Sequence, residues 1–175
     1  KEDTEITGPL AAKLFVSSET TDADLFLVVR LFSADMKEVT FKGTVDPHTP
    51  IAQGWLRASH RKLDTKKSKP WRPWHSHDEK QPLKPGSIYE LDIEIWPTCI
   101  VVPAGYRLAL SVRGKDYEYS GEALNLSNFA HPLNGCGPFL HDDPKDRPKK
   151  IFGGKGTLHT GPKHPSHLLL PVVPP

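Results

Sequence analysis

The chain has 175 residues and a formal net charge of +2, from 23 Lys and Arg residues against 21 Asp and Glu residues. This length suits a single domain with a sizeable core. The near-neutral charge argues against a nucleic-acid partner, because proteins that bind nucleic acids usually carry a strong excess of positive charge. No apolar run approaches the length of a membrane span, so no membrane partner is expected either. With 18 prolines, 13 glycines and no sustained helical period, the chain is predicted to be all-β.

Short strands are predicted through the first third of the chain, at residues 4–7, 12–18, 25–32, 38–42 and 51–60. Gly8 and Pro9 are expected to break the first strand from the second, because proline donates no hydrogen bond and glycine accepts turn dihedrals. The segment 25–32, LFLVVRLF, is apolar on both faces apart from Arg30. Such a run is typical of a central strand that is covered on both sides.

Residues 61–85 interrupt this pattern with a basic run, RKLDTKKSK, followed by a segment rich in proline and aromatic residues. A loop of this length is often functional or part of an interface. Trp71 and Trp74 lie beside prolines and could form an aromatic platform for a sugar or a peptide. They could equally pack against a neighbouring domain, where aromatic anchors are favoured, and we prefer this interpretation. The basic run is interpreted as a solvated loop.

The strongest periodicity in the chain runs from residue 88 to residue 114. Four apolar side chains alternate with three carboxylates in its first half, Tyr89, Leu91, Ile93 and Ile95 against Glu90, Asp92 and Glu94. Tyr106, Leu108, Leu110 and Val112 repeat the alternation in the second half. This period of two predicts two half-buried antiparallel strands, interrupted by Pro97, Pro103 and Gly105.

Residues 115–155 are predicted to form long ordered loops. Asp116 and Tyr117 could line the rim of a site, or belong to a loop with packed tyrosines. The segment from His141 to Asp143 could offer carboxylate oxygens to calcium, but the basic residues that follow favour ion pairing. Strand-like segments at 156–160 and 166–173 close the domain, with Pro171 marking an edge or a strand end.

The metal-site candidate that we weigh first is the segment from His75 to Asp78. In an extended loop His75 and His77 point the same way, which suits a shared ion. A third and a fourth ligand are not evident, so a solvated polar loop tip is preferred and no metal or cofactor is predicted. Cys99 and Cys136 neither require nor exclude a disulfide, and two free thiols are the preferred interpretation.

No serine is flanked by glycines in the G-x-S-x-G pattern of an α/β-hydrolase nucleophile. The chain also lacks the alternation of strands and helices that such an enzyme needs. No catalytic residue is therefore predicted within this chain, and the sequence does not identify the compartment.

Five blocks in order resemble the C-terminal, non-catalytic domain of the X-Pro dipeptidyl-peptidase and cocaine esterase family of serine hydrolases. The first is TEITGPLAAKLFVSS at 4–18, followed by the strand that begins at Asp24. The others are GWLRASHR at 54–61, LKPGSIYELDIEIWPTCIVVPAGYRLALSV at 83–112 and HTGPKHPSHLLLPVVP at 159–174. The blocks span nearly the whole chain.

This resemblance implies a jelly-roll-type β-sandwich, similar to galactose-binding domains, packed on an α/β-hydrolase catalytic domain of the same protein. The family's triad lies in that other domain, so no catalytic residue is carried onto this chain. The implied role is to buttress the catalytic domain, shape substrate access and contribute to homo-oligomer contacts. The family's first strand or strands are expected to be missing from this chain, so that either a companion chain supplies them or the sheet has an open edge. The alternative function is a free-standing carbohydrate-binding module that uses Trp71 and Trp74.

Overall fold

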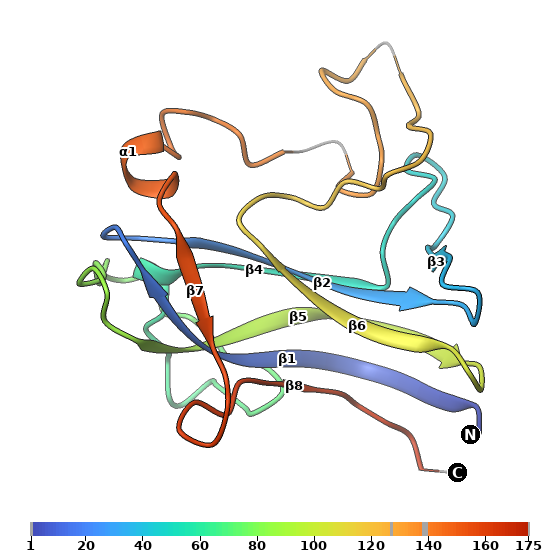
Figure 1. Cartoon of the computed structure of the whole chain (residues 1–175), viewed down its shortest axis with the longest axis horizontal. Coiled ribbons are helices and arrows are strands. Elements are labelled where there is room, and N and C mark those ends of the chain that lie inside the picture. The colour runs from blue at the N-terminus through green and yellow to red at the C-terminus, as the bar shows by residue number, and fades with distance from the viewer. Residues whose placement is uncertain (1, 127, 138–139, 175) are drawn as a thin grey trace.

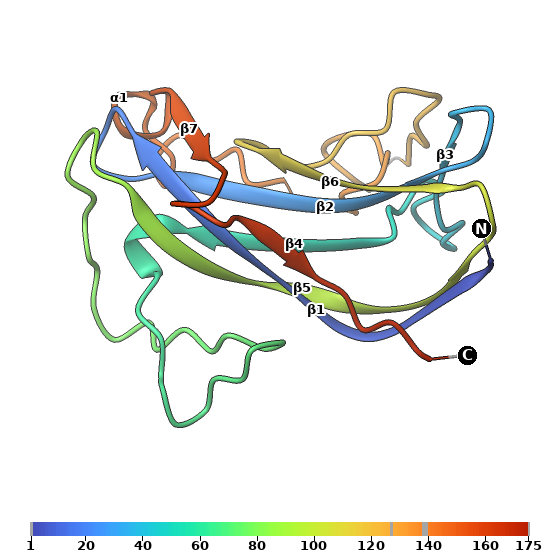
Figure 2. The same ribbon diagram turned by 60° about the horizontal axis from the view of Figure 1, so that its bottom comes forward.

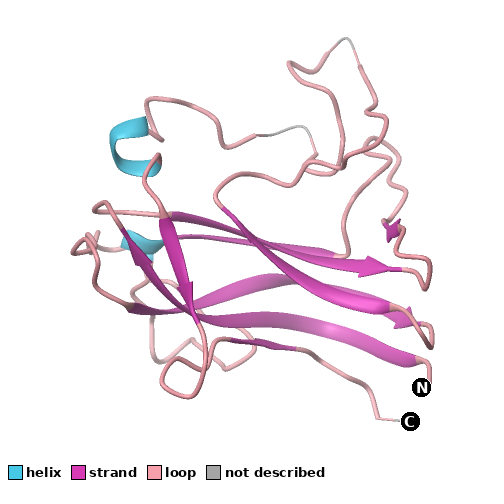
Figure 3. Ribbon diagram, in the orientation of Figure 1, coloured by secondary structure: helices cyan, strands magenta, loops and turns pink. Residues whose placement is uncertain are grey.

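Two antiparallel β-sheets pack face to face in the computed structural model, which describes residues 2–126, 128–137 and 140–174 (Figures 1 and 3). The strands are β1 (Thr4–Ser18), β2 (Asp24–Phe32), β3 (Glu38–Val39), β4 (Ala52–Arg57), β5 (Tyr89–Val102), β6 (Arg107–Arg113), β7 (Gly156–His159) and β8 (His167–Leu169). A 3₁₀ turn, Ala58–His60, and a single helical turn, α1 (Lys149–Phe152), are the helical elements of the described residues. The predicted all-β sandwich is confirmed. No helix within the described ranges is long and apolar enough to cross a membrane.

Each sheet is built around one central strand. In the first, sheet A, β1 pairs with β5 along one edge and with β7 and β8 along the other. In the second, sheet B, β2 pairs with β6 along one edge and with β3 and β4 along the other. The core between the sheets includes Leu10, Leu14, Leu27, Val29, Leu91, Ile93 and Ile95. Strands β5 and β6 therefore lie in opposite sheets, although a short turn connects them (Figure 2).

The prediction that residues 25–32 form a strand covered on both sides is confirmed by β2. All five residues of 25–29 are buried. The side chains at 25, 27 and 29 enter the core between the sheets. On the outer face, the ring of Phe26 lies 5.4 Å from that of His141 and under the guanidinium of Arg147. The loop region 115–155 thus covers the outside of sheet B.

Two predicted strand breaks, at Gly8-Pro9 and at Pro97, are wrong. β1 runs unbroken past Pro9, and β5 runs unbroken past Pro97. The pairing register shifts here, so that Pro9 lies opposite both Trp96 and Pro97. This is a β-bulge, in which the extra residue is left out of the ladder and a missing N–H therefore costs little.

Several predicted segments are shorter in the structure. The strand predicted at 51–60 ends at Arg57, because the chain then turns: the N–H of Arg61 donates to the carbonyl of Ala58 and closes the 3₁₀ turn. The strands predicted at 38–42 and 166–173 shrink to two and three residues. The helical turn α1 lies within the region that was predicted to be loop.

The two sheets meet edge to edge at Gly54. A Cβ atom on Gly54 of β4 would lie 2.1 Å from the carbonyl oxygen of Glu94 and 2.9 Å from Cα of Ile95 in β5. Only glycine permits this approach, because no side chain atom fits between the two backbones. Sheet A and sheet B therefore adjoin along β4 and β5.

We expect Gly54→Ala to destabilise the domain by about 3 kcal/mol or more, since the added methyl group overlaps backbone that cannot move without separating the strands. The matched control is Gly114→Ala, where no described atom lies within 4 Å of the new Cβ and φ is not positive. Urea unfolding followed by tryptophan fluorescence measures both variants. Equal urea midpoints for the two variants would contradict the close approach of β4 to β5.

Candidate functional site

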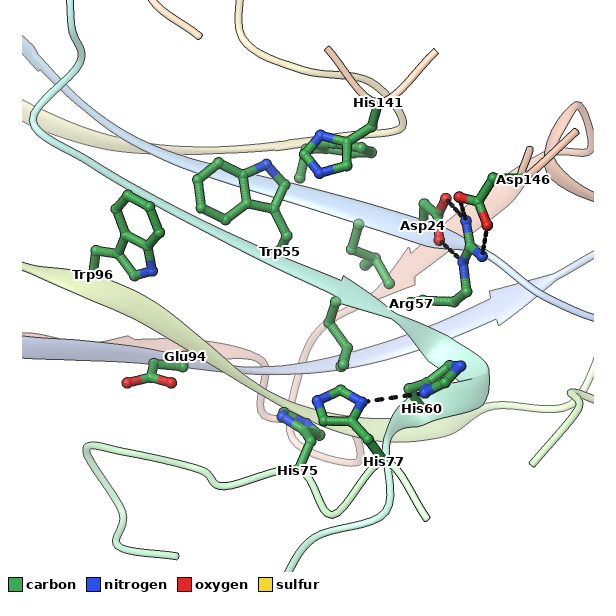
Figure 4. A pocket seen from close by; sticks show the side chains of 13 residues that line it. Asp24, Trp55, Arg57, His60, His75, His77, Glu94, Trp96, His141 and Asp146 are labelled. Atoms are coloured by element: carbon green, nitrogen blue, oxygen red, sulfur yellow. Dashed lines mark hydrogen bonds and ion pairs between the residues drawn. The ribbon is translucent and has the colours of Figure 1, made fainter. Parts of the chain in front are cut away.

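A cleft of about 450 Å³ lies along the junction of β4 and β5, between the two long loop regions (Figure 4). The strands supply its floor, and the loops supply the two walls. Its aromatic, charged and imidazole side chains are Asp24, Phe26, Trp55, Arg57, His60, His75, His77, Glu94, Trp96, His141 and Asp146. None of the described residues that line it is a serine or a cysteine.

Trp55 and Trp96 form an edge-to-face pair in the cleft, with ring centroids 5.1 Å apart and planes at 73°. Trp55 follows Gly54 on the outward face of β4, and Trp96 lies at the bulge of β5. The close approach of the two strands therefore brings rings from opposite sheets together. Trp96 is 62% exposed despite this contact. His141 lies 6.1 Å from the Trp55 ring and continues the aromatic surface.

Asp116 and Tyr117 are both buried, and Asp116 lies behind His141 of the cleft wall. The Asp116 carboxylate accepts hydrogen bonds from the backbone N–H and from Nδ1 of His141, at 2.7 and 2.9 Å. The Tyr117 hydroxyl donates to Glu38 at 2.8 Å, and burial raises the pKa of this tyrosine. Asp116 thus positions His141 at the cleft, whereas Tyr117 packs beneath the loop.

Arg57 is held by two carboxylates. Its guanidinium donates to both oxygens of Asp24 and to both oxygens of Asp146, over 2.8–3.0 Å. The hydrogen bonds with Asp24 make the largest contribution, followed by those with Asp146, and together they raise the pKa of Arg57. Arg147 also donates to Asp24, at 2.9 Å. The cation is consequently satisfied within the chain, and it ties β4 to the loop region 115–155.

We expect Asp24→Asn to cost about 2–4 kcal/mol of unfolding free energy, because it leaves two partly buried guanidinium groups without their shared carboxylate. The Asp24 side chain is only 9% exposed. The control is Asp35→Asn, at a 57% exposed carboxylate paired with Lys37. An exposed pair contributes about 1 kcal/mol or less. Chemical denaturation of both variants measures the difference, and equal losses would contradict it.

Three histidines form the opposite wall of the cleft. Nδ1 of His60 lies 3.2 Å from Nδ1 of His77, and the rings of His75 and His77 are 6.0 Å apart. Burial lowers the pKa of both His60 and His75. Nε2 of His75 is buried without a hydrogen-bond partner. Among the described residues, no group of three or more His, Cys, Asp or Glu side chains is arranged to hold a metal ion.

Trp71 and Trp74 have different surroundings, although both belong to loop 61–85. Trp71 lines a separate cavity of about 340 Å³ with Pro9 and Leu169, over the outer face of sheet A. The ring of Trp74 is contacted by the cations of Lys67 and Arg72, each 5.2 Å from its centroid. Of the six residues singled out from the sequence, the cleft brings together only His75 and His77.

The sequence analysis did not single out Trp55, Trp96 or His60 as site residues. Period-two alternation could have identified the two tryptophans, since each follows an inward-facing residue of a predicted strand. No local pattern could have identified His60, because its neighbour His77 lies 17 residues away.

Comparisons with known proteins agree on one family. The sequence profile of the X-Pro dipeptidyl-peptidase C-terminal non-catalytic domain matches residues 1–169. A CocE/NonD family hydrolase from Staphylococcus aureus has a similar crystal structure, with a TM-score of 0.83 and 28% identity over 99% of this chain. Cocaine esterase from Rhodococcus sp. is 24% identical over 97% of the chain. A protein from Mycobacterium bovis, provisionally named a serine esterase, is 27% identical over 98%.

The chain matches only part of each of these proteins. It spans 22% of the Mycobacterium protein, 23% of the cocaine esterase and 29% of the Staphylococcus hydrolase. More than two thirds of each relative therefore lies outside the region of similarity.

Proposed function

Because the chain belongs to the family of X-Pro dipeptidyl-peptidase C-terminal non-catalytic domains, we propose that it is the accessory sandwich of a larger serine hydrolase. In this role it buttresses an α/β-hydrolase catalytic domain and helps to wall the entrance to the substrate pocket. The parent enzyme is an X-Pro dipeptidyl-peptidase or an acyl esterase. The names of the relatives, cocaine esterase and CocE/NonD hydrolase, support this class.

The observation that carries the proposal is a set of exposed apolar side chains on the outside of sheet A. We call it the sheet A patch; it comprises Trp71 (49% exposed), Trp96 (62%), Val101 (56%) and Leu169 (39%). Loop 61–85 covers part of this sheet and contributes Trp71, but the remaining side chains stay in solvent. Surfaces of this kind mark protein interfaces, where aromatic side chains serve as anchors.

The free edge of β6 supports the same proposal. Within the described ranges no strand pairs with the side of β6 that faces away from β2. The inward side chains Leu108, Leu110 and Val112 pack against the core but remain only partly buried. An unpaired edge beside a half-covered core can accept a further strand, and a larger polypeptide could supply one.

We introduce Val101→Asp into the larger hydrolase, where it places an unpaired charge in the proposed interface. We expect a loss of about 2 kcal/mol or more, either in the free energy of unfolding or in the transition-state stabilisation that kcat/KM reports. The control is Val45→Asp, the same change at a valine that is 43% exposed and lies outside the sheet A patch. Thermal unfolding, together with hydrolysis of a p-nitrophenyl ester and of an X-Pro amide, measures both variants.

This experiment distinguishes the two parts of the proposed role, buttressing the catalytic domain and shaping substrate access. A lower unfolding temperature with unchanged kinetics supports buttressing alone, and a raised KM supports a part in substrate access. If Val101→Asp and Val45→Asp behave alike in every measurement, the sheet A patch is not the interface.

A further inference from the structure

The pair formed by His60 and His77 has the spacing of two ligands on one metal ion. Their Nδ1 atoms are 3.2 Å apart, and Figure 4 shows the two rings facing one another across the cleft wall. With zinc–nitrogen bonds of about 2.0–2.1 Å, two ligands are separated by about 3.3 Å in tetrahedral geometry and by about 2.9 Å in octahedral geometry. The observed separation lies between these values. The two nitrogens share a hydrogen bond, so an ion binds both once this contact is broken and the rings rotate to direct their lone pairs at one point.

The backbone holds the two imidazoles in this arrangement. His60 ends the 3₁₀ turn that follows β4, and His77 belongs to loop 61–85. Next to them, the N–H of Ser76 donates to the carbonyl of Lys62 at 3.0 Å. The neighbouring residues Leu63 and His75 form an antiparallel bridge. Ligands from two segments that are already joined lose little conformational freedom when an ion binds.

The charges around the pair permit a cation. Asp22 acts on His60 as a nearby negative charge, whereas Lys80 and Arg57 act as positive ones. The charge of Arg57 is offset by its two carboxylate partners, described above. Burial and the neighbouring His77 lower the pKa of His60, which favours the neutral imidazole that metals require.

We propose that His60 and His77 chelate a divalent transition ion of the zinc, nickel or copper class, with water in the remaining coordination positions. Imidazole nitrogens suit these metals, whereas calcium and magnesium prefer oxygen ligands. The proposal is independent of the role in a larger hydrolase, because it concerns residues of this chain alone. His75 lies beside the pair but is not required as a ligand.

The test is isothermal titration of the chelator-treated protein with ZnCl₂ at pH 7.5, repeated with NiCl₂. The unsubstituted protein should bind one ion saturably. His77→Ala and His60→Gln should each weaken that affinity by about tenfold or more, since each removes one of the two ligands. The control is His167→Ala, which alters an exposed histidine on β8. Circular dichroism establishes that each variant is folded.

A second measurement applies even if His60→Gln fails to fold. The electron paramagnetic resonance spectrum of bound Cu²⁺ should show coupling to two imidazole nitrogens, and to only one in His77→Ala. Absence of saturable binding in the unsubstituted protein would overturn the proposal. Equal affinities of the unsubstituted protein and His77→Ala would also overturn it, because the ion would then bind at other histidines.

Discussion

The close approach of β4 to β5 at Gly54 is the constraint on which the rest of the structure depends. It allows the edges of two sheets to adjoin, closes the core on that side and makes their outer faces continuous. The tryptophans of the cleft meet only because of it, since they come from strands of different sheets. A single position without a side chain therefore determines the location of the cleft.

The two long loop regions have a common role, because each covers the outer face of one sheet. Loop region 115–155 buries the outside of β2 beneath His141, Arg147 and the residues around Tyr117. Loop 61–85 covers sheet A less completely and leaves the sheet A patch in solvent. The difference gives the sandwich one closed face and one open face. The open face is the one that we propose to contact the catalytic domain.

Local patterns predicted the strands well where burial sets the order of apolar and polar residues. The alternation over 88–112 placed β5 and β6, and the apolar run at 25–32 identified β2 as a strand covered on both sides. The effect of Pro97 could not be predicted, because it depends on the register with Pro9 in another strand. Alternation marks the two tryptophans of the cleft as outward-facing, but the contacts that join the cleft residues link positions distant in sequence and could not be predicted. The family was recognised from ordered sequence blocks, which retain information that single motifs lack.

The central claim, that the open face of sheet A packs against a catalytic domain, can be tested most directly at Cys99. This exposed thiol lies on the outer side of β5, between Trp96 and Val101 of the sheet A patch, and Cys136 is a half-buried internal reference. The measurement is the rate at which a maleimide labels each cysteine in the native larger hydrolase and in urea, followed by peptide mass spectrometry. Our account predicts that Cys99 is strongly protected in the native enzyme despite its exposure on this domain. Labelling of native Cys99 as fast as in urea would contradict it.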